Sequence, residues 1–321
     1  MTASNSTGKI GSPVSWLVEN LQFFLMRVKG ISNQRAQMNA VISEIEEYAR
    51  MYRDATGRDL RRARILEIGY GARPLRLMAL QSLGYNATGI DLDRPTFGTV
   101  QDFVEIYRCN GSRRLIKSVV RHLLFDRHER RALDAALRSR GSRLRIDPNG
   151  FLVGDAACYP FDDKSIDFVF SEDVFEHIPP TGIDQLCRRL SLALAPEGLA
   201  LITPAIYSGI SGGHLVEWYP HTLPQERRRS TEPWEHLRKR RAVPDCYLNE
   251  LRINDYTAMF SEHFCLMQVI DRDKGIGREF LTEEIRAELS SFEVDELLCN
   301  RVTFVLKGRD RPRGAEAQTS N

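Results

Sequence analysis

The chain has 321 residues, 42% of them hydrophobic and 27% charged, which allows a substantial core in one large domain or two small ones. Its formal net charge of +2 gives no overall attraction to nucleic acid or membranes, and no apolar run approaches the ~18 residues of a membrane-spanning helix. The Ser- and Thr-rich N-terminus is not a secretory signal, and the six scattered cysteines form no Cys-x-x-Cys pair, so a cytoplasmic protein with reduced thiols is expected.

The N-terminal part of the chain predicts helices. Residues 14–29 are rich in apolar side chains, and residues 33–55 carry apolar side chains at helical spacing. Gly57 lies just beyond the second segment. We expect residues 1–60 to form a polar tail followed by a helical lid, which closes over a ligand cleft or contacts a second subunit of a homo-oligomer. The polar residues 309–321 are expected to be a disordered tail.

The pattern then changes to that of a βαβ unit. Residues 64–69 are a short apolar strand that runs into a glycine turn, a helix follows from Pro74 to about Gly84, and residues 87–91 are a second strand. Two strands joined in this way by a helix are parallel, and their crossover is right-handed.

The rest of the chain continues the alternation of strands and helices, with two interruptions. Residues 95–149 predict a basic, helical insertion, and residues 205–250 lack periodicity and are expected to form cap or substrate loops. The further predicted strands are residues 151–153, 166–171, 199–203, 266–270 and 301–306, and the further helices begin near Thr181 and Asn254. This order predicts a doubly wound α/β sheet, and we assign residues 61–308 to one domain.

Three motifs follow predicted strands, at the edge where open α/β sheets bind ligands. The Glu-Ile-Gly-Tyr-Gly run 67–71 ends the first strand, and its glycines allow a sharp turn and a close approach of ligand to backbone. Asp91 ends the next strand, where a carboxylate can accept both hydroxyls of a ribose. The Gly-Asp-Ala run 154–156 follows the third strand, where its acid can accept a bond from an adenine amino group.

These motifs resemble the nucleoside-binding motifs of class I S-adenosylmethionine-dependent methyltransferases. The runs 160–171 and 172–178 extend the resemblance to the type 11 branch, and residues 194–198 resemble the turn before the fifth strand of that fold. The resemblance implies a Rossmann-like, mostly parallel seven-stranded sheet with an antiparallel last strand, and S-adenosylmethionine as the cofactor. The candidate cofactor-binding residues are Glu67, Gly69, Gly71, Arg73, Asp91, Asp155, Ala156, Ser171 and Asp173.

The glycine motif departs from the family pattern at Arg73, where a third glycine is common. Either Pro74 begins the helix and Arg73 is a structural variant, or Arg73 pairs with the methionyl carboxylate of the cofactor. A dinucleotide fingerprint beginning at Gly69 would need glycine or alanine at position 74, so NAD is not expected. For Asp91 and Asp155 the alternative is a purely structural role in a turn.

A hydroxyl acceptor must lose its proton during methyl transfer, and histidine is the usual base near neutral pH. His177 follows the fourth strand and His214 and His221 follow the fifth, at the rim where the methyl group should project. We take His177 and His214 as the candidate catalytic residues, with packing at a helix entry as the alternative for His177. His177 with Glu176, or His214 with Glu217, could hold a metal, but no three-ligand spacing supports one and no metal is expected.

Basic residues are concentrated between positions 113 and 145 and again in the runs 227–229 and 238–241. They are either solvated faces or a site for an anionic acceptor, and the few aromatics of the insertion do not indicate stacking with single-stranded nucleic acid. The sequence therefore predicts a methyltransferase that acts on an oxygen of a small molecule or glycan. The alternatives are N- or C-methylation, and a non-catalytic S-adenosylmethionine-binding interaction protein.

Overall fold

The computed structural model describes residues 34–223, 229–241, 244 and 246–309. The predicted helix over residues 14–29 and residues 310–321 of the predicted tail lie outside this part of the chain. No helix among the described residues is both long and apolar enough to cross a membrane.

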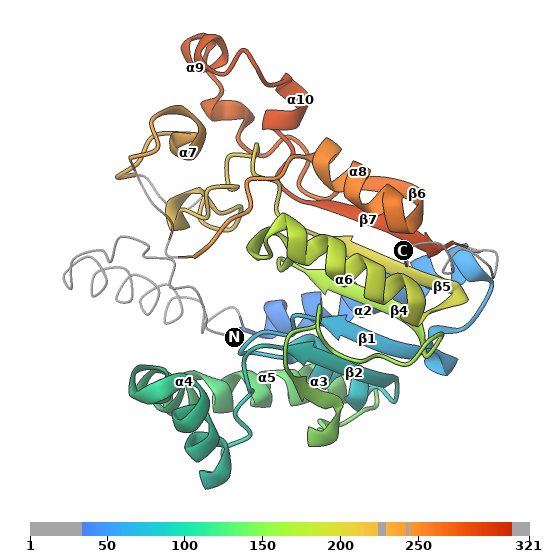
Figure 1. Ribbon diagram of the computed structural model, residues 1–321. Coiled ribbons are helices and arrows are strands. Elements are labelled where there is room, and N and C mark those ends of the chain that lie inside the picture. The colour runs from blue at the N-terminus through green and yellow to red at the C-terminus, as the bar shows by residue number, and fades with distance from the viewer. Residues whose placement is uncertain (1–33, 224–228, 242–243, 245, 310–321) are drawn as a thin grey trace, which may run out of the picture.

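One seven-stranded sheet forms the centre of the molecule (Figure 1). Its strands, in the spatial order β3-β2-β1-β4-β5-β7-β6, are β1 (Arg64–Ile68), β2 (Asn86–Asp91), β3 (Phe151–Val153), β4 (Ile166–Glu172), β5 (Leu194–Thr203), β6 (Phe264–Asp271) and β7 (Val302–Gly308). The strands β1 to β5 pair in parallel, whereas β7 is antiparallel to both β5 and β6. The predicted mostly parallel sheet with an antiparallel last strand is confirmed.

Helices cover both faces of the sheet and make two separate cores. The helices are α2 (Gln34–Thr56), α3 (Leu75–Ser82) and α5 (Arg127–Arg138) on one face, and α6 (Pro180–Ala193) and α8 (Ile253–His263) on the other. Strand β4 contributes to both cores, because its side chains alternate between the faces: Phe168 and Phe170 pack with the first group and Val169 with the second.

Helix α2, which we expected to be part of an N-terminal lid, belongs to the layer that covers the sheet, whereas the other predicted helix of that lid lies outside the described residues. Its buried side chains recur at helical spacing and are Met38, Ile42, Ile45, Tyr48 and Tyr52. The ring of Tyr48 lies 5.0 Å from that of Phe170 and the ring of Tyr52 lies 5.7 Å from that of Phe168. Burying a large apolar side chain contributes about 1.5–3 kcal/mol, so this face holds the helix on the sheet.

The predicted basic insertion is helical. Helix α4 (Val100–Arg121) begins at a Thr99 capping box, passes through one turn of π-helix (His122–Asp126) and continues as α5. Helix α4 extends away from the sheet, while α5 packs on α2 and α3 (Figure 1). Several of the insertion's arginines have partners: Arg114 pairs with Asp93, Arg138 with Asp134, and Arg140 with Glu46.

The loop after β5 and the segment between β6 and β7 together form a cap with a small core of its own. In the described part of residues 205–250, which were predicted to lack periodicity, the only α-helix is the short α7 (Glu235–Arg238), and the segment between β6 and β7 adds α9 (Glu283–Glu288) and α10 (Val294–Leu297). Trp218 and Trp234 are buried in this core, and the indole of Trp234 donates to the Ser208 carbonyl at 3.2 Å. In Figure 1 the cap lies above the edge of the sheet at which β1, β2 and β4 end.

Candidate functional site

The predicted motifs meet at one edge of the sheet because the strands that precede them are parallel. The loops after β1, β2, β3 and β4 all leave from their carboxyl ends. The chain order reverses between β1 and β4, which are neighbours in the sheet, and ligands of open α/β sheets bind at such a switch point.

The glycine turn after β1 needs glycine at two positions. Gly69 has φ of +78°, its N–H donates to the Ile90 carbonyl at 2.8 Å, and a β-carbon there would lie 2.3 Å from Val174. Gly71 has φ of +65°, and a β-carbon there would meet nothing within 4 Å among the described residues. The first glycine therefore allows close packing against the loop after β4, and the second faces open space.

Asp91 holds the glycine turn in place. Its carboxylate accepts the N–H of Gly71 at 2.7 Å and the N–H of Asp93, also at 2.7 Å. Burial raises the pKa of Asp91, and these two backbone bonds oppose that shift. A carboxylate can accept about four hydrogen bonds, so about two positions remain for ligand hydroxyls.

Glu67 is a buried carboxyl beneath the same turn. It is 3% exposed, and its Oε2 atom has no hydrogen-bond partner among the described residues. Burial raises the pKa of Glu67 to about 8, while the charge of Arg76 acts to lower it. A cationic ligand group at this end of the site would supply the missing partner.

The remaining predicted cofactor residues lie at the same edge with different surroundings. Asp155 is exposed and accepts the N–H of Ala157 at 2.9 Å, and Ala156 is half-buried beside it. Ser171 is buried and donates to the Ile68 carbonyl at 2.9 Å, so its hydroxyl ties β4 to β1. Asp173 has φ of +56° and lies beside Arg301, whose guanidinium is 3.5 Å from the Asp173 carboxylate.

These features fit the cofactor that the sequence motifs imply. The glycine turn has open space at Gly71, Asp91 keeps unused acceptor positions, and the buried Glu67 carboxyl needs a partner such as the methionyl ammonium group. Asp91, Glu67 and the backbone of the glycine turn would hold S-adenosylmethionine, and Asp155 would face its adenine.

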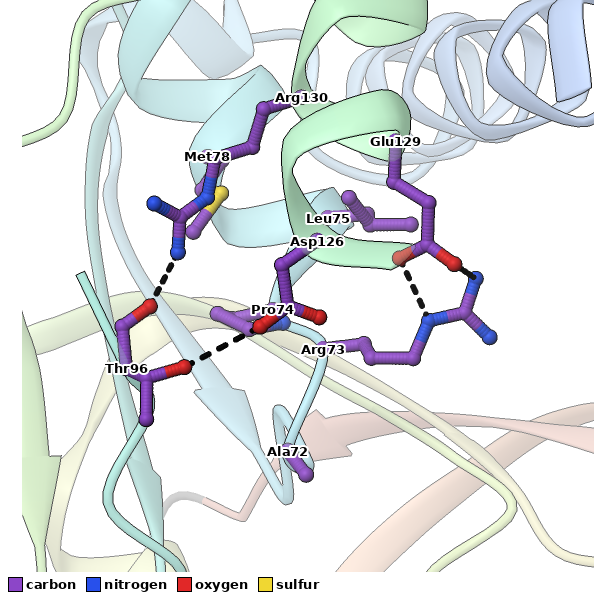
Figure 2. A pocket seen from close by; sticks show the side chains of 9 residues that line it. All are labelled: Ala72, Arg73, Pro74, Leu75, Met78, Thr96, Asp126, Glu129 and Arg130. Atoms are coloured by element: carbon purple, nitrogen blue, oxygen red, sulfur yellow. Dashed lines mark hydrogen bonds and ion pairs between the residues drawn. The ribbon is translucent and has the colours of Figure 1, made fainter. Parts of the chain in front are cut away.

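Arg73 is held by the insertion. Its guanidinium makes two contacts with the Glu129 carboxylate on α5, at 2.9 Å and 2.6 Å (Figure 2). Thr96 and Asp126 hydrogen-bond beside this pair, so the start of α3 is joined to the loop after β2 and to the insertion. The pair gives Arg73 a structural task that needs no ligand.

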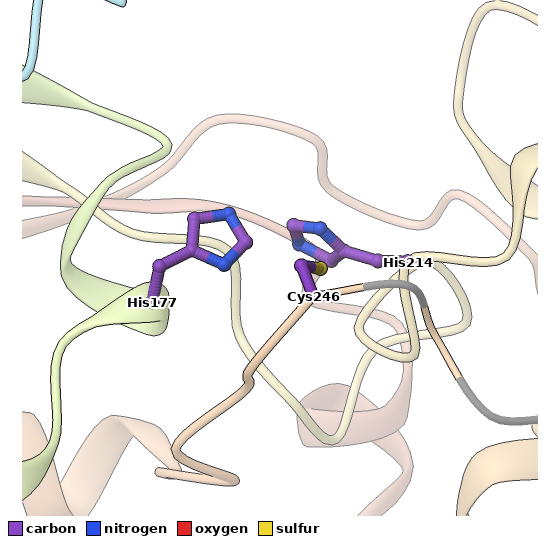
Figure 3. Close-up of side chains that lie close together, drawn as sticks. All are labelled: His177, His214 and Cys246. Carbon is purple, nitrogen blue, oxygen red and sulfur yellow. The ribbon is translucent and has the colours of Figure 1, made fainter. Parts of the chain in front are cut away.

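His177 and His214, which are far apart in sequence, face each other at the rim. Their ring centroids are 4.9 Å apart and their planes are nearly perpendicular, with Cys246 beside them (Figure 3). His177 Nδ1 lies 2.9 Å from the Tyr247 carbonyl, which can only accept, so Nδ1 donates this hydrogen bond. Burial, reinforced by the nearby His177, lowers the pKa of His214 to about 4.

Sequence reasoning named Glu176 only as a possible metal partner and did not name Cys246 at all. Glu176 is 3% exposed, and its Oε1 atom lies 3.9 Å from His177 Nε2 and 3.8 Å from His214 Nε2. Burial raises the pKa of Glu176 well above its usual range. Glu217, the other acid considered, instead accepts the N–H groups of Ser230 and Thr231.

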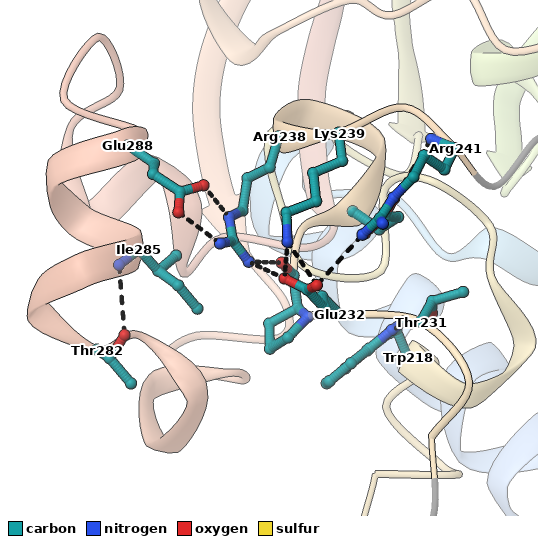
Figure 4. A network of polar contacts seen from close by, with 11 residues as sticks. Trp218, Thr231, Glu232, Arg238, Lys239, Arg241, Thr282, Ile285 and Glu288 are labelled. Atoms are coloured by element: carbon teal, nitrogen blue, oxygen red, sulfur yellow. Dashed lines mark hydrogen bonds and ion pairs between the residues drawn. The ribbon is translucent and has the colours of Figure 1, made fainter.

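The charges of the basic run 238–241 are largely compensated by acidic side chains inside the cap. Glu232 contacts Arg238, Lys239 and Arg241, and Arg238 also pairs with Glu288 (Figure 4). These contacts join α7 to α9, so they give the run a structural role in the cap.

A comparison with protein-family models identifies the domain. The family model described as a methyltransferase domain matches residues 37–257. Phosphoethanolamine N-methyltransferase 2 of Caenorhabditis elegans is 39% identical over 72 residues, which are 22% of this chain and only 15% of that protein.

Two solved structures illustrate the structural matches. The PH0226 protein of Pyrococcus horikoshii OT3 has a TM-score of 0.42 and 14% identity over 83% of this chain and 90% of its own. Geranyl diphosphate C-methyltransferase of Streptomyces coelicolor A3(2) has a TM-score of 0.39 and 14% identity over 82% of this chain and 76% of its own.

Proposed function

The chain belongs to the methyltransferase-domain family and uses S-adenosylmethionine, and we propose that it methylates a hydroxyl oxygen of a small-molecule or glycan acceptor. When bound, the cofactor supplies a methyl group already activated on sulfur. The chain's own residues must then align the acceptor and promote loss of its proton.

The observation that carries this proposal is the His177–His214 pair at the rim of the sheet. His177 follows β4 and His214 follows β5, two neighbouring parallel strands, and the Nε2 atoms of both histidines lie within 3.9 Å of Glu176 Oε1. The low pKa of His214 keeps its ring neutral at pH 7. Two imidazoles at this place suit the removal of a hydroxyl proton, a task that an amine with a free lone pair would not require.

The competing function is methylation of a nitrogen. The matched segment of the phosphoethanolamine N-methyltransferase is short, and that enzyme's substrate class enters only as an acceptor worth testing. The basic runs would favour an anionic acceptor, although many of their described members already have acidic partners.

The test combines acceptor discovery with matched histidine variants. The full chain is incubated with methyl-labelled cofactor and hydroxyl or amine acceptors, including glycans and phosphoethanolamine, and mass spectrometry locates the label. For a hydroxyl product, we expect His177→Gln and His214→Gln to lower the turnover rate by ~10²–10⁴-fold with little change in cofactor affinity.

His263→Gln is the control for these variants. His263 is buried, whereas His177 and His214 are half-buried, and it hydrogen-bonds to Asp184 at 2.7 Å; it lies where β6 begins, at the opposite edge of the sheet. It should retain wild-type turnover. Near wild-type rates in both single variants and in the double variant, or label only on nitrogen, would overturn the proposal.

A further inference from the structure

Three side chains from separate segments converge at the rim. His177 follows β4, His214 lies in the loop after β5, and Cys246 precedes α8. One ligand atom from each, two imidazole nitrogens and one sulfur, lies within 4.8 Å of the other two (Figure 3). In zinc sites the metal–nitrogen distance is about 2.0–2.1 Å and the metal–sulfur distance about 2.3 Å, so a small inward movement of the side chains would complete the set.

A buried carboxyl beside these residues is a second, independent indication of a cation. Both oxygens of Glu176 are buried without a hydrogen-bond partner in the described part of the chain, and Oε1 lies within 3.9 Å of both Nε2 atoms. An unsatisfied buried carboxyl is costly, whereas a neighbouring cation would compensate its charge.

The orientation of His177 is also that of a metal ligand. Ligating histidines usually donate their other ring N–H to a carbonyl or carboxylate, which fixes the tautomer and the ring. His177 Nδ1 donates to the Tyr247 carbonyl at 2.9 Å, and its Nε2 atom lies 3.9 Å from Glu176 Oε1. Tyr247 directly follows Cys246, so one short segment supplies a ligand and orients another.

We propose that His177, His214 and Cys246 bind one zinc ion, with the fourth position open. Two nitrogens and a thiolate suit zinc better than magnesium or calcium, which prefer oxygen ligands, and three protein ligands with an open position are typical of catalytic zinc. The thiolate of Cys246 and the carboxylate of Glu176 together balance the two positive charges of the ion.

The inference rests on the proposed function and changes the task of the histidine pair, because imidazoles whose lone pairs bind the ion do not take the proton themselves. The imidazoles hold the ion, the acceptor hydroxyl occupies the open position, and the ion lowers the pKa of that hydroxyl. The proton passes to the Glu176 carboxylate, the oxygen forms its bond to the methyl carbon, and the bond from that carbon to sulfur breaks.

Metal binding by the full chain tests the inference without cofactor or acceptor. The protein is stripped with a chelator and titrated with zinc, and cobalt is then substituted to detect thiolate-to-metal absorption. We expect one equivalent of zinc to bind. Cys246→Ser and His214→Gln should weaken zinc binding by more than the ~10–100-fold that loss of an outer hydrogen-bond partner costs.

Two controls make the result specific. Cys265→Ser changes an exposed thiol at the opposite edge of the sheet and should keep both the affinity and the absorption band. His263→Gln removes a member of the other candidate cluster, Asp184–Glu262–His263, and should also leave the zinc affinity unchanged. Melting temperature and S-adenosylhomocysteine affinity show whether each variant is folded.

The outcomes separate this inference from the proposed function. Absence of a stoichiometric zinc site in the wild type, or full zinc affinity in folded Cys246→Ser, would overturn the inference while methyl transfer to a hydroxyl could stand. A zinc site with the expected ligands, combined with label only on nitrogen, would instead overturn the hydroxyl acceptor and leave the metal site established.

Discussion

Alanine substitutions at three glycines would separate backbone strain, close packing and cofactor contact. Gly57, Gly69 and Gly71 all have positive φ, at +69°, +78° and +65°. Alanine in this region costs about 1–2 kcal/mol, and this strain is common to all three variants. Gly57 follows α2, away from the site, and a β-carbon there meets nothing within 4 Å, so Gly57→Ala measures the strain alone.

Gly69→Ala should lower the free energy of unfolding more than Gly57→Ala does, because the added β-carbon would lie 2.3 Å from Val174 Cγ2. Overpacking of this kind adds typically about 1–3 kcal/mol, which gives a total loss of about 2–5 kcal/mol in the free energy of unfolding. The double variant Gly69→Ala with Val174→Ala should recover part of the added cost. Urea denaturation measures the free energy of unfolding of the three single glycine variants and of this double variant.

Gly71→Ala should lower the free energy of unfolding only by the cost of backbone strain. It should also weaken S-adenosylhomocysteine binding, because the added methyl group enters the open space over the glycine turn. Isothermal titration calorimetry measures this affinity, with Gly57→Ala as the control that retains it. Wild-type affinity in folded Gly71→Ala would refute the placement of the cofactor over this turn. Equal stability losses in Gly69→Ala and Gly57→Ala would refute the packing argument.

Three further predictions follow from single side chains. Asp91→Ala should weaken S-adenosylhomocysteine binding at least ~10-fold by calorimetry in a folded protein, since a charged acceptor is lost, and unchanged affinity would remove Asp91 from the site. Arg73→Met and Glu129→Gln should each leave that affinity nearly unchanged, because the two side chains hold each other, but Arg73→Met should cost about 1–3 kcal/mol of stability because it removes a charge partner of the buried Glu129 carboxylate; a large loss of affinity in Arg73→Met alone would favour a contact with the cofactor carboxylate. Burial lowers the pKa of His214 and of His236 to about 4. The stability that each neutral ring contributes is therefore complete above pH 6.5, and the free energy of unfolding falls by about 1.4 kcal/mol per pH unit for each residue as the pH drops toward 4. His236→Gln should flatten the pH profile of this free energy measured by urea denaturation, and an unaltered profile would contradict the assignment.

The sheet could be predicted because each of its strands carries a local signal. The run 64–69 joins an apolar strand to a glycine turn, and the helices that follow have apolar faces at the right spacing. Such signals do not tell which surface an amphipathic helix covers. Helix α2 was recognised from its periodicity, but its place on the sheet depends on Phe168 and Phe170, more than 100 residues away.

The candidate site was predictable only where its residues follow strands directly. Asp91 and His177 stand within a few residues of a strand end, so the parallel sheet alone brings them to one edge. Cys246 comes from an aperiodic part of the chain, and no spacing in the sequence relates it to His214. The role of Arg73 depended likewise on Glu129, which a separate insertion supplies.

The buried carboxyls at this rim differ in whether their oxygens have hydrogen-bond partners within the protein. Glu172 accepts hydrogen bonds from Tyr48 and Thr203, so its burial is compensated within the fold. Glu67 Oε2 and both oxygens of Glu176 lack such bonds among the residues the structure describes, although each costs free energy while it is unsatisfied. The two lie at different ends of the site, one under the glycine turn and the other beside the histidine pair. We therefore propose a separate cationic group for each, the cofactor's ammonium at Glu67 and, under the zinc inference above, a metal ion at Glu176.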